Sequence, residues 1–293
     1  MSGKTARSRV RNGLGRPLIA GAGALVMLLG LIGAAPAMAT PKGDFSVFSD
    51  CPTKTSQVCT YAKTETGKIV IGKEDVPIEK AIVVQGGLVE NESGGFNMVA
   101  AKDGNTLSKA PQKVPGGLSG LVKCNEISNF IERATCELFF ENGATGVTAT
   151  TELAAPAHSV EVNLGNLLAG EGTGLSLPIK VKLENPLLGS SCYVGSNSSP
   201  IVVNLTTGKS GVLTGTPGEA ELLEESIIAL PHASLVNGTY SAPAASGCGG
   251  IFSFLIDPII DSRLGLPSAS GKNEAVLNGK LEVVAAEEVT AHE

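Results

Sequence analysis

The chain has few side chains that could do chemistry. Cys192 lies in the stretch LGSSCYVGS (residues 188–196), and a cysteine thiolate can attack an acyl carbon. Such a nucleophile needs a base, and the sequence holds three histidines. We set His292 aside because it falls in a C-terminal tail that we expect to fray. His158 and His232 remain as candidate bases, with a structural or surface role as the alternative for each.

Cys192 fits a protease nucleophile only in part. Papain-like proteases carry the signature C-G-[SA]-C-[WY], but Gly189 stands in place of its first cysteine. Their histidine lies roughly 130–150 residues downstream of the nucleophile, whereas 101 residues (293 − 192) follow Cys192. A free thiolate would also be oxidised outside the cell. We therefore expect Cys192 to be disulfide-bonded, and unreactive to alkylation in the native protein.

All six cysteines follow residue 39, and an even number in an exported chain predicts disulfides. Fifteen connectivities are possible, and pairing of sequence neighbours is the simplest. That pairing gives Cys51–Cys59, Cys124–Cys136 and Cys192–Cys248. The alternative role for these cysteines is a zinc site, which lacks support because no two of them have CxxC spacing. We predict no metal and no other cofactor.

Two aspartates could form a carboxylate pair for acid–base work. Asp257 and Asp261 lie in the stretch DPIIDSRLG (257–265), which also predicts a helix with Asp257 as its N-cap. We favour the helix, with Pro258 in its first turn and Gly265 just after its end. Its core-facing side chains would be Ile259, Ile260 and Leu264.

Motifs for other chemistries are incomplete. The run GKS (208–210) resembles the end of a phosphate-binding loop, but Val203 stands where that loop needs glycine. The stretch GEGTGL (170–175) lacks the last glycine of a dinucleotide-binding turn. No G-x-S-x-G elbow follows the N-terminal segment. An acidic cluster indicates a solvated face, since it lacks the spacing of a calcium loop: Glu219, Glu221, Glu224 and Glu225.

The first 39 residues predict a secretory signal peptide. Five basic residues and no acid flank an uncharged run from Leu18 to Ala34, and Ala37-Met38-Ala39 offers a cleavage site before Thr40. The alternative is an uncleaved signal anchor, since residues 17–41 carry no charge and nearly reach the length of a membrane span. Both versions place the bulk of the chain outside the cell, and we expect a secreted bacterial protein.

The composition narrows the choice of partner. After cleavage 17 basic residues (22 − 5) and 28 acidic residues would remain, a net charge of −11. That balance argues against nucleic acid, which needs clustered lysine and arginine. Tryptophan is absent and tyrosine occurs three times, so few aromatic platforms exist for sugars or bases. We expect an extracellular or cell-envelope ligand, and no stable membrane insertion after cleavage.

Short runs rich in Val, Ile and Thr, separated by turn residues, predict a mainly β fold. The expected strands are residues 68–72, 80–88, 96–100, 145–153, 158–164, 178–184, 200–208 and 280–287, and the expected turns are Thr66-Gly67, Asp103-Gly104 and Asn237-Gly238. We predict an antiparallel, sandwich-like architecture with one or two short helices, stapled by disulfides. The Gly-rich stretch 165–177 could join two halves, 40–164 and 165–293, or lie within one continuous domain.

A second helix is expected after Cys124, where apolar residues recur with a period of 3.6: Ile127, Phe130, Ile131, Ala134 and Leu138. A helix spanning residues 124–136 would separate its ends by about 18 Å, too far for a disulfide. We therefore expect the helix to end before Cys136, with ELFF (137–140) as a strand, or the two cysteines to have other partners.

Four N-x-[ST] sequons would be exposed glycosylation sites in a eukaryotic host. They begin at Asn91, Asn197, Asn204 and Asn237. The Ala- and Gly-rich N-terminal segment is more typical of a bacterial protein, so we do not rely on them.

Two C-terminal stretches resemble functionally uncharacterised exported proteins of actinobacterial type. They are VKLENPLLGSSCYVGSNSSPIVVNLTTG (181–208) and GLPSASGKNEAVLNGKLE (265–282). The resemblance covers mainly the C-terminal half, implies export and a cysteine-bearing C-terminal region, and carries over no catalytic residue.

The sequence therefore predicts a secreted, disulfide-stabilised protein with a non-enzymatic binding role or a structural role in the envelope or outside the cell. The alternative is an extracellular hydrolase that uses His158 or His232 with a nearby serine or acid. We assign no catalytic, cofactor-binding or metal-binding residue.

Overall fold

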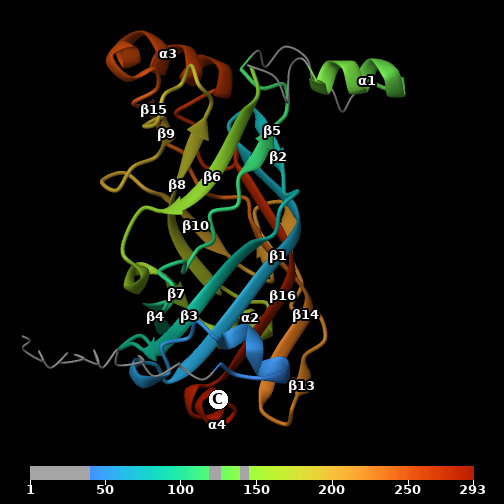
Figure 1. The fold of residues 1–293 in the computed structure, drawn as a ribbon, viewed down its shortest axis with the longest axis vertical. Coiled ribbons are helices and arrows are strands. Elements are labelled where there is room, and N and C mark those ends of the chain that lie inside the picture. The colour runs from blue at the N-terminus through green and yellow to red at the C-terminus, as the bar shows by residue number, and fades with distance from the viewer. Residues whose placement is uncertain (1–39, 119–126, 139–144) are drawn as a thin grey trace, which may run out of the picture. The chain divides into compact units, whose positions relative to one another are not determined.

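The computed structural model describes residues 40–118, 127–138 and 145–293. An antiparallel sheet of fourteen strands dominates it, and Ala39–Glu293 form one compact unit (Figure 1). The prediction of a mainly β, antiparallel fold with short helices is confirmed. Within the described ranges, no helix is both long and apolar enough to cross a membrane.

The strands in chain order are β1 (Val58–Ile71), β2 (Glu74–Pro77), β3 (Ile82–Glu90), β4 (Phe96–Ala100), β5 (Gln112–Val114), β6 (Val147–Leu153), β7 (Glu161–Val162), β8 (Leu175–Glu184), β9 (Tyr193–Val194), β10 (Ile201–Leu205), β11 (Lys209–Ser210), β12 (Leu213–Thr214), β13 (Glu221–Leu223), β14 (Ile227–Asn237), β15 (Ala245–Ser246) and β16 (Glu274–Ala285). The α-helices are α1 (Phe130–Cys136), α2 (Leu164–Ala169), α3 (Ser253–Leu264) and α4 (Ala286–Ala291). The 3₁₀ helices are η1 (Gly43–Phe48), η2 (Thr53–Thr55), η5 (Ala157–Ser159) and η6 (Gly250–Phe252).

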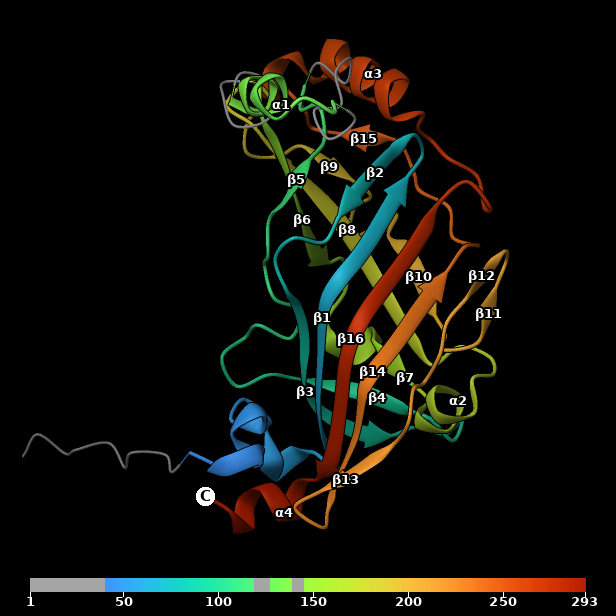
Figure 2. The same cartoon turned by 90° about the vertical axis from the view of Figure 1, so that its right-hand side faces the viewer.

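The sheet folds back until its two ends meet. Its strands run in the order β13-β14-β16-β1-β3-β4-β7-β8, and β10 pairs with β8. A bridge between Thr206, just after β10, and Val236 of β14 then joins the far end to the beginning. The strands β1, β16 and β14 thus form one layer that faces β6, β8 and β10 (Figure 2). Strands from before and after residue 165 pair directly, as β1 does with β16.

Two β-bulges support this curvature. The register of β1 against β16 shifts between Thr64 and Thr66, and the register of β14 against β16 shifts between Leu230 and Ala233. Both Thr64 and Ala233 pair with the same residue, Gly279 of β16. Because a bulge bends its strand and increases the local twist, two at one level help the layer to wrap round.

Alternation of side chains explains the main core. In β10 the residues alternate between buried and exposed, so that Ile201, Val203 and Leu205 point inward. In β8, with the sequence LSLPIKVKLE, every second residue is likewise buried, among them Leu175, Leu177 and Ile179. A second, smaller core lies on the outer face near the end of β16, where η1 and α4 pack over it.

The expected turn at Thr66-Gly67 is wrong, because β1 continues through both residues. Gly67 has a φ of 129° there, and a Cβ at this position would lie 1.9 Å from the carbonyl oxygen of Val276. Glycine is therefore used for a close approach of two strands rather than for a turn. The turn at Asp103-Gly104 is present, with the Gly104 amide bonded to the Ala101 carbonyl.

The expected strand at 158–164 is mostly wrong. Only Glu161–Val162 pair in the sheet, because residues 157–159 form η5 after Pro156. The side chain of Asn163 then accepts a hydrogen bond from the Asn166 amide and caps α2. The stretch 165–177 accordingly contains a helix and the start of β8.

Both predicted helices form, but neither as expected. The helix α1 runs from Phe130 through Cys136, so it does not end before Cys136, and residues 137–138 do not form a strand. Its large apolar residues Phe130 and Ile131 are exposed. The helix α3 begins at Ser253, so Asp257 and Pro258 lie inside it and Asp257 is not its N-cap. Gly265 does end α3 in the left-handed conformation. Ile260 and Leu264 pack on the core, whereas Ile259 is exposed.

Two predicted disulfides are confirmed. Cys51 bonds to Cys59, and Cys192 bonds to Cys248 across 56 residues. All four cysteines are buried. The predicted partner pair Cys124–Cys136 lies outside the described residues, as Cys124 falls in one of the gaps.

Candidate functional site

The folded sheet encloses an apolar cavity between its layers. On one side the lining comes from β1, β3 and β16, with Ile69, Ile71, Ile82, Val84 and Leu277. On the other side it comes from β8 and β10, with Leu175, Leu177, Ile179, Ile201, Val203 and Leu205. These are the inward positions of the alternating strands, so the lining follows directly from the period-2 pattern.

The cavity holds little space that a water molecule can enter. The empty space bounded by its lining is about 820 Å³ when its opening to solvent is included, and the part open to a water molecule's centre is about 70 Å³. Several lining side chains remain half-buried although they face inward, among them Ile69, Ile71, Leu235 and Leu277. Closely packed cores leave little such space, so the interior of this sheet is incompletely filled.

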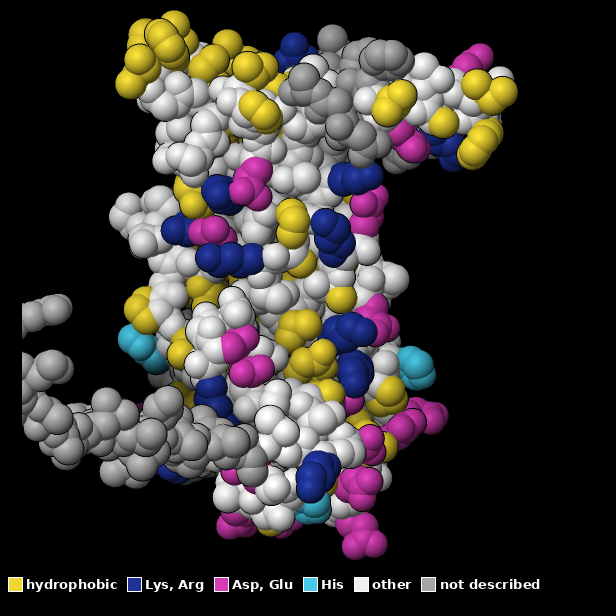
Figure 3. Space-filling model, viewed as in Figure 1, with side chains coloured by type: hydrophobic (Ala, Val, Ile, Leu, Met, Phe, Trp, Pro, Cys, Tyr) yellow, Lys and Arg dark blue, Asp and Glu magenta, His cyan; other side chains and the backbone are white. Residues whose placement is uncertain are grey.

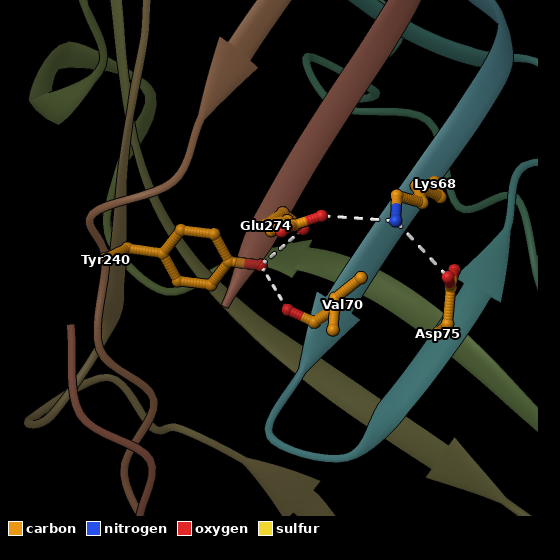
Figure 4. A network of polar contacts seen from close by, with 5 residues as sticks. All are labelled: Lys68, Val70, Asp75, Tyr240 and Glu274. Atoms are coloured by element: carbon orange, nitrogen blue, oxygen red, sulfur yellow. Dashed lines mark hydrogen bonds and ion pairs between the residues drawn. The ribbon is translucent and has the colours of Figure 1, made fainter. Parts of the chain in front are cut away.

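The hydroxyl of Tyr240, a polar group at the cavity wall, is turned away from the cavity. The ring of Tyr240 lines the cavity, while its hydroxyl lies 2.7 Å from the Val70 carbonyl oxygen and 3.0 Å from that of Glu274 (Figure 4). Burial raises the pKa of Tyr240 well above its ordinary value, with a smaller contribution from the nearby Glu274 carboxylate. The hydroxyl therefore stays protonated and has a structural role, while the ring of Tyr240 offers the cavity an aromatic face.

The outer face of the same strands is charged. Lys68 lies 3.1 Å from Glu274 and 3.4 Å from Asp75, and its pKa is raised chiefly by the hydrogen bond to Glu274 (Figure 4). Lys182 and Glu184, two residues apart on β8, are joined at 2.8 Å. That hydrogen bond lowers the pKa of Glu184. Exposed pairs of this kind contribute little stability, and they mark the solvent side of each strand.

Cys192, the sequence's first candidate nucleophile, is part of a staple. Its disulfide to Cys248 is buried, and the surrounding backbone is held by carboxylates from α3. Asp257 accepts hydrogen bonds from the amides of Cys248 at 2.7 Å and Gly247 at 3.1 Å, and Asp261 accepts one from Ala245 at 2.7 Å. The two aspartates thus bind backbone amides and are not arranged as an acid–base pair.

The candidate histidine bases are exposed and lie apart from the cavity. His158 is in η5, and His232 lies on β14 at its bulge. His232 borders a surface hollow together with Glu65 and Ser234. Within the described residues, no hydrogen bond or ion pair joins the His232 side chain to that serine or glutamate. The hollow therefore lacks the bonded base and nucleophile that a hydrolase uses.

His292, which we expected in a frayed tail, is held in place. Its ring stacks on Phe45 with the ring centres 3.8 Å apart, and its Nδ1 lies 2.8 Å from the Glu288 carbonyl oxygen. Phe45 belongs to the second core beneath α4, and this contact fixes the end of that helix. The histidine has a structural role here.

The acidic cluster lies at the surface, around the turn between β13 and β14. Glu219, Glu221, Glu224 and Glu225 are exposed, as a solvated face requires. The last two occupy the turn between β13 and β14 with positive φ, at 47° and 62°.

Asn237 is 1% exposed, so the expectation of an exposed sequon is wrong there. No group of three or more His, Cys, Asp or Glu in the described part of the chain is placed to hold a metal ion.

Sequence reasoning missed the cavity and one of its walls. The strand β14, which contributes Leu235, is not among the expected strands. Its alternating buried residues Ile227, Ala229 and Ala233 could have indicated it, but Pro231 and the bulge interrupt the pattern.

A search of protein-family models, curated proteins and solved structures finds no match to this chain.

Proposed function

We propose that this chain is an exported, non-catalytic binding protein whose folded sheet holds one narrow apolar molecule, such as the hydrocarbon chain of a lipid. The observation that carries the proposal is the incompletely filled cavity with its aliphatic lining. Ligand sites are typically concave and mostly apolar. Hydrocarbon that leaves water for such a space gains about 25 cal/mol per Å² of buried surface, so affinity needs no charged or catalytic group.

The dimensions of the cavity support a thin ligand. Only about 70 Å³ of the cavity admits the centre of a water molecule, so any ligand must displace some side chains of the lining. A single extended alkyl chain requires less displacement of this half-buried aliphatic lining than a rigid fused ring system does.

The charged groups at the cavity also favour hydrocarbon. Two lysines, Lys63 and Lys280, border it, and each is paired at 2.7 Å with a carboxylate, Glu65 and Glu282 respectively. Because these cations already have anionic partners, an anionic headgroup drawn into the cavity would have to compete with a carboxylate. Burial of a charge without a partner is costly, so the apolar part of a ligand fits this space better than a charged part.

Secretion is part of the proposal and is supported by two features. The N-terminal 39 residues have the pattern of a signal peptide. The disulfides Cys51–Cys59 and Cys192–Cys248 are compatible with an oxidising compartment outside the cell. An apolar molecule in such a compartment needs a carrier to remain dispersed, which is the role we infer.

Hydrolysis remains the second candidate because His232, Ser234 and Glu65 border one hollow. A serine-directed fluorophosphonate separates the two functions. Labelling of the wild-type protein that is lost in His232→Ala and Ser234→Ala would favour the hydrolase. The binding proposal predicts no labelling.

Binding is tested by calorimetric titration with fatty acids and n-alkanes of increasing chain length. The variant Leu277→Phe places a ring in the cavity, and we expect it to weaken binding at least about tenfold. Overpacking should cost about 1–3 kcal/mol of stability, so the affinities are compared for the folded proteins. Absence of binding by the wild type, or equal binding by Leu277→Phe, would overturn the proposal.

Val160→Phe is the matched control. Val160 is fully buried in the same core but does not line the cavity. Overpacking there should cost about 1–3 kcal/mol of stability and leave the affinity of the folded protein within about twofold.

A further inference from the structure

The outer surface of α3 and η6 is apolar, and no other part of the described chain covers it. Ile251 is 85% exposed, Phe254 71% and Leu255 54%, and Phe252 and Ile259 are also more than half exposed. Hydrophobic side chains gather over α3 at its end of the molecule (Figure 3). Isolated exposed apolar residues are ordinary, but a contiguous group on one helix marks an interaction site.

The helix has apolar side chains on both of its faces. Ile256, Ile260 and Leu264 pack against the main core, while Phe254, Leu255 and Ile259 lie on the opposite side. Such a helix is normally covered all round. Within residues 249–262 the only charged side chains are Asp257 and Asp261, and both carboxylates are bonded to backbone amides of residues 245–248. The exposed face itself is apolar, and the exposed Ser262 and Arg263 lie at its edge in the last turn of α3.

The position of this face is fixed. The two aspartates hold α3 to the segment that carries Cys248, and the disulfide ties that segment to Cys192. At the other end of the helix, the amide of Lys73 donates to the Leu264 carbonyl oxygen at 2.8 Å. The apolar side chains are thus presented on a rigid support at the surface.

We propose that this apolar face, formed by Ile251, Phe252, Phe254, Leu255 and Ile259, docks reversibly onto the surface of a lipid bilayer. A specific protein partner needs polar groups around an apolar centre to fix its register, and Ser262 and Arg263 at one edge supply few of them. A bilayer needs none, and it accommodates a convex apolar surface by letting it enter between headgroups. The docking surface shares no residue with the cavity lining, so this proposal stands apart from the proposed ligand site.

The distribution of charge favours the same orientation. The exposed acids of the β13–β14 turn and the acidic helix α4, with Glu287 and Glu288, lie at the end of the molecule opposite to α3 (Figures 1 and 2). Lipid surfaces are frequently anionic and repel that end. The apolar end would therefore face the bilayer and the acidic end the solvent. Because the contact is apolar, it should not weaken when salt is raised.

The chain contains no tryptophan, which makes a direct test possible. In residues 40–293, which form one compact unit, Phe254→Trp places a single fluorophore on the docking surface. With phosphatidylcholine vesicles we expect a blue shift of its emission and quenching by brominated acyl chains, at low and high salt. The matched control is Leu222→Trp on β13, 63% exposed at the acidic end, which should show neither.

Vesicle flotation of the unlabelled protein gives the second readout. Phe254→Ser and Leu255→Ser should each reduce partitioning at least about tenfold, and Leu222→Ser should leave it within about twofold. Both docking residues are exposed, so these variants should fold normally. Absence of flotation of the wild type would overturn the proposal, as would equal emission shifts for Phe254→Trp and its control Leu222→Trp. So would self-association that the serine variants abolish without any vesicle binding, because the face would then belong to a second copy.

Discussion

The backbones of Thr206 and Val236 exchange two hydrogen bonds, of 3.0 and 2.8 Å. This pair joins the end of β10 to β14, and it is the seam at which the folded sheet closes around its apolar interior. Asn237, the next residue, is buried and reaches across the seam. Its side-chain nitrogen Nδ2 donates a hydrogen bond to the Asn204 carbonyl oxygen, and its side-chain oxygen accepts one from the Thr239 backbone amide at 2.8 Å.

Asn237→Ala should open this seam. The substitution leaves the Asn204 carbonyl and the Thr239 amide without these partners, which should lower the free energy of unfolding by about 2–3 kcal/mol. Urea unfolding measures the loss, and hydrogen exchange should show faster exchange at Thr206 and Val236. Asn204→Ala is the control, because its side chain is exposed and should cost less than about 1 kcal/mol. Equal costs for the two variants would contradict the role of the seam.

The two disulfides should contribute unequally. Cys192–Cys248 closes 56 residues and Cys51–Cys59 closes 8. On the chain-entropy model their removal by paired alanine substitution should cost about 4 and about 2.5 kcal/mol respectively. Urea unfolding of the two double variants tests this order, and a reversed order would show that loop closure does not govern their effect. In the unreduced wild type, iodoacetamide should not label Cys192.

Substitutions in the turn between β13 and β14 should stabilise the protein. Glu224 and Glu225 both have positive φ, a conformation that costs an ordinary residue about 1–2 kcal/mol. Asn-Gly is the preferred pair in turns of this kind, so Glu224→Asn with Glu225→Gly should stabilise the protein by about 1 kcal/mol. Thermal unfolding measures the gain. A lower melting temperature would mean that the glutamates make contacts which compensate for the strain.

Tyr240 should make stability fall at alkaline pH. Burial raises the pKa of Tyr240 in the folded protein above the unfolded value of about 10. The unfolded chain therefore loses this proton first, so the stabilisation is complete below pH 10 and declines as the pH rises above it. Tyr240→Phe should be less stable at neutral pH and should lose less stability between neutral and alkaline pH. Unfolding curves that remain parallel across this range would contradict the assignment.

Much of the sheet could be predicted because apolar and polar residues alternate along individual strands. The inward residues of β8 and β10 repeat every second position, and the strand expected at residues 96–100 is β4 at its observed bounds, Phe96–Ala100. Pairing of neighbouring cysteines also predicted both observed disulfides. The bulge at Pro231 hid β14, because it breaks the alternation that identifies a strand.

The cavity and the docking surface could not be read from the sequence. Inward-facing residues such as Leu177 and Leu277 have the same pattern whether the layers meet or leave a gap, which depends on the curvature of the whole sheet. Asp257 has the sequence context of a helix cap, but its carboxylate binds the amides of Gly247 and Cys248 instead. That choice depends on how α3 packs against the segment that carries Cys248, an arrangement that the local pattern around Asp257 does not contain.

The central claim is that an apolar molecule enters the folded sheet, and methyl NMR tests it most directly. Titration with a long-chain fatty acid should shift the methyl signals of Ile201, Val203 and Leu277, and nuclear Overhauser contacts should join them to the acyl chain. The methyls of Ile227 and Val289, buried in the second core, should not move. Shifts confined to exposed residues, or no contact between the acyl chain and Ile201, Val203 or Leu277 at saturation, would contradict the account.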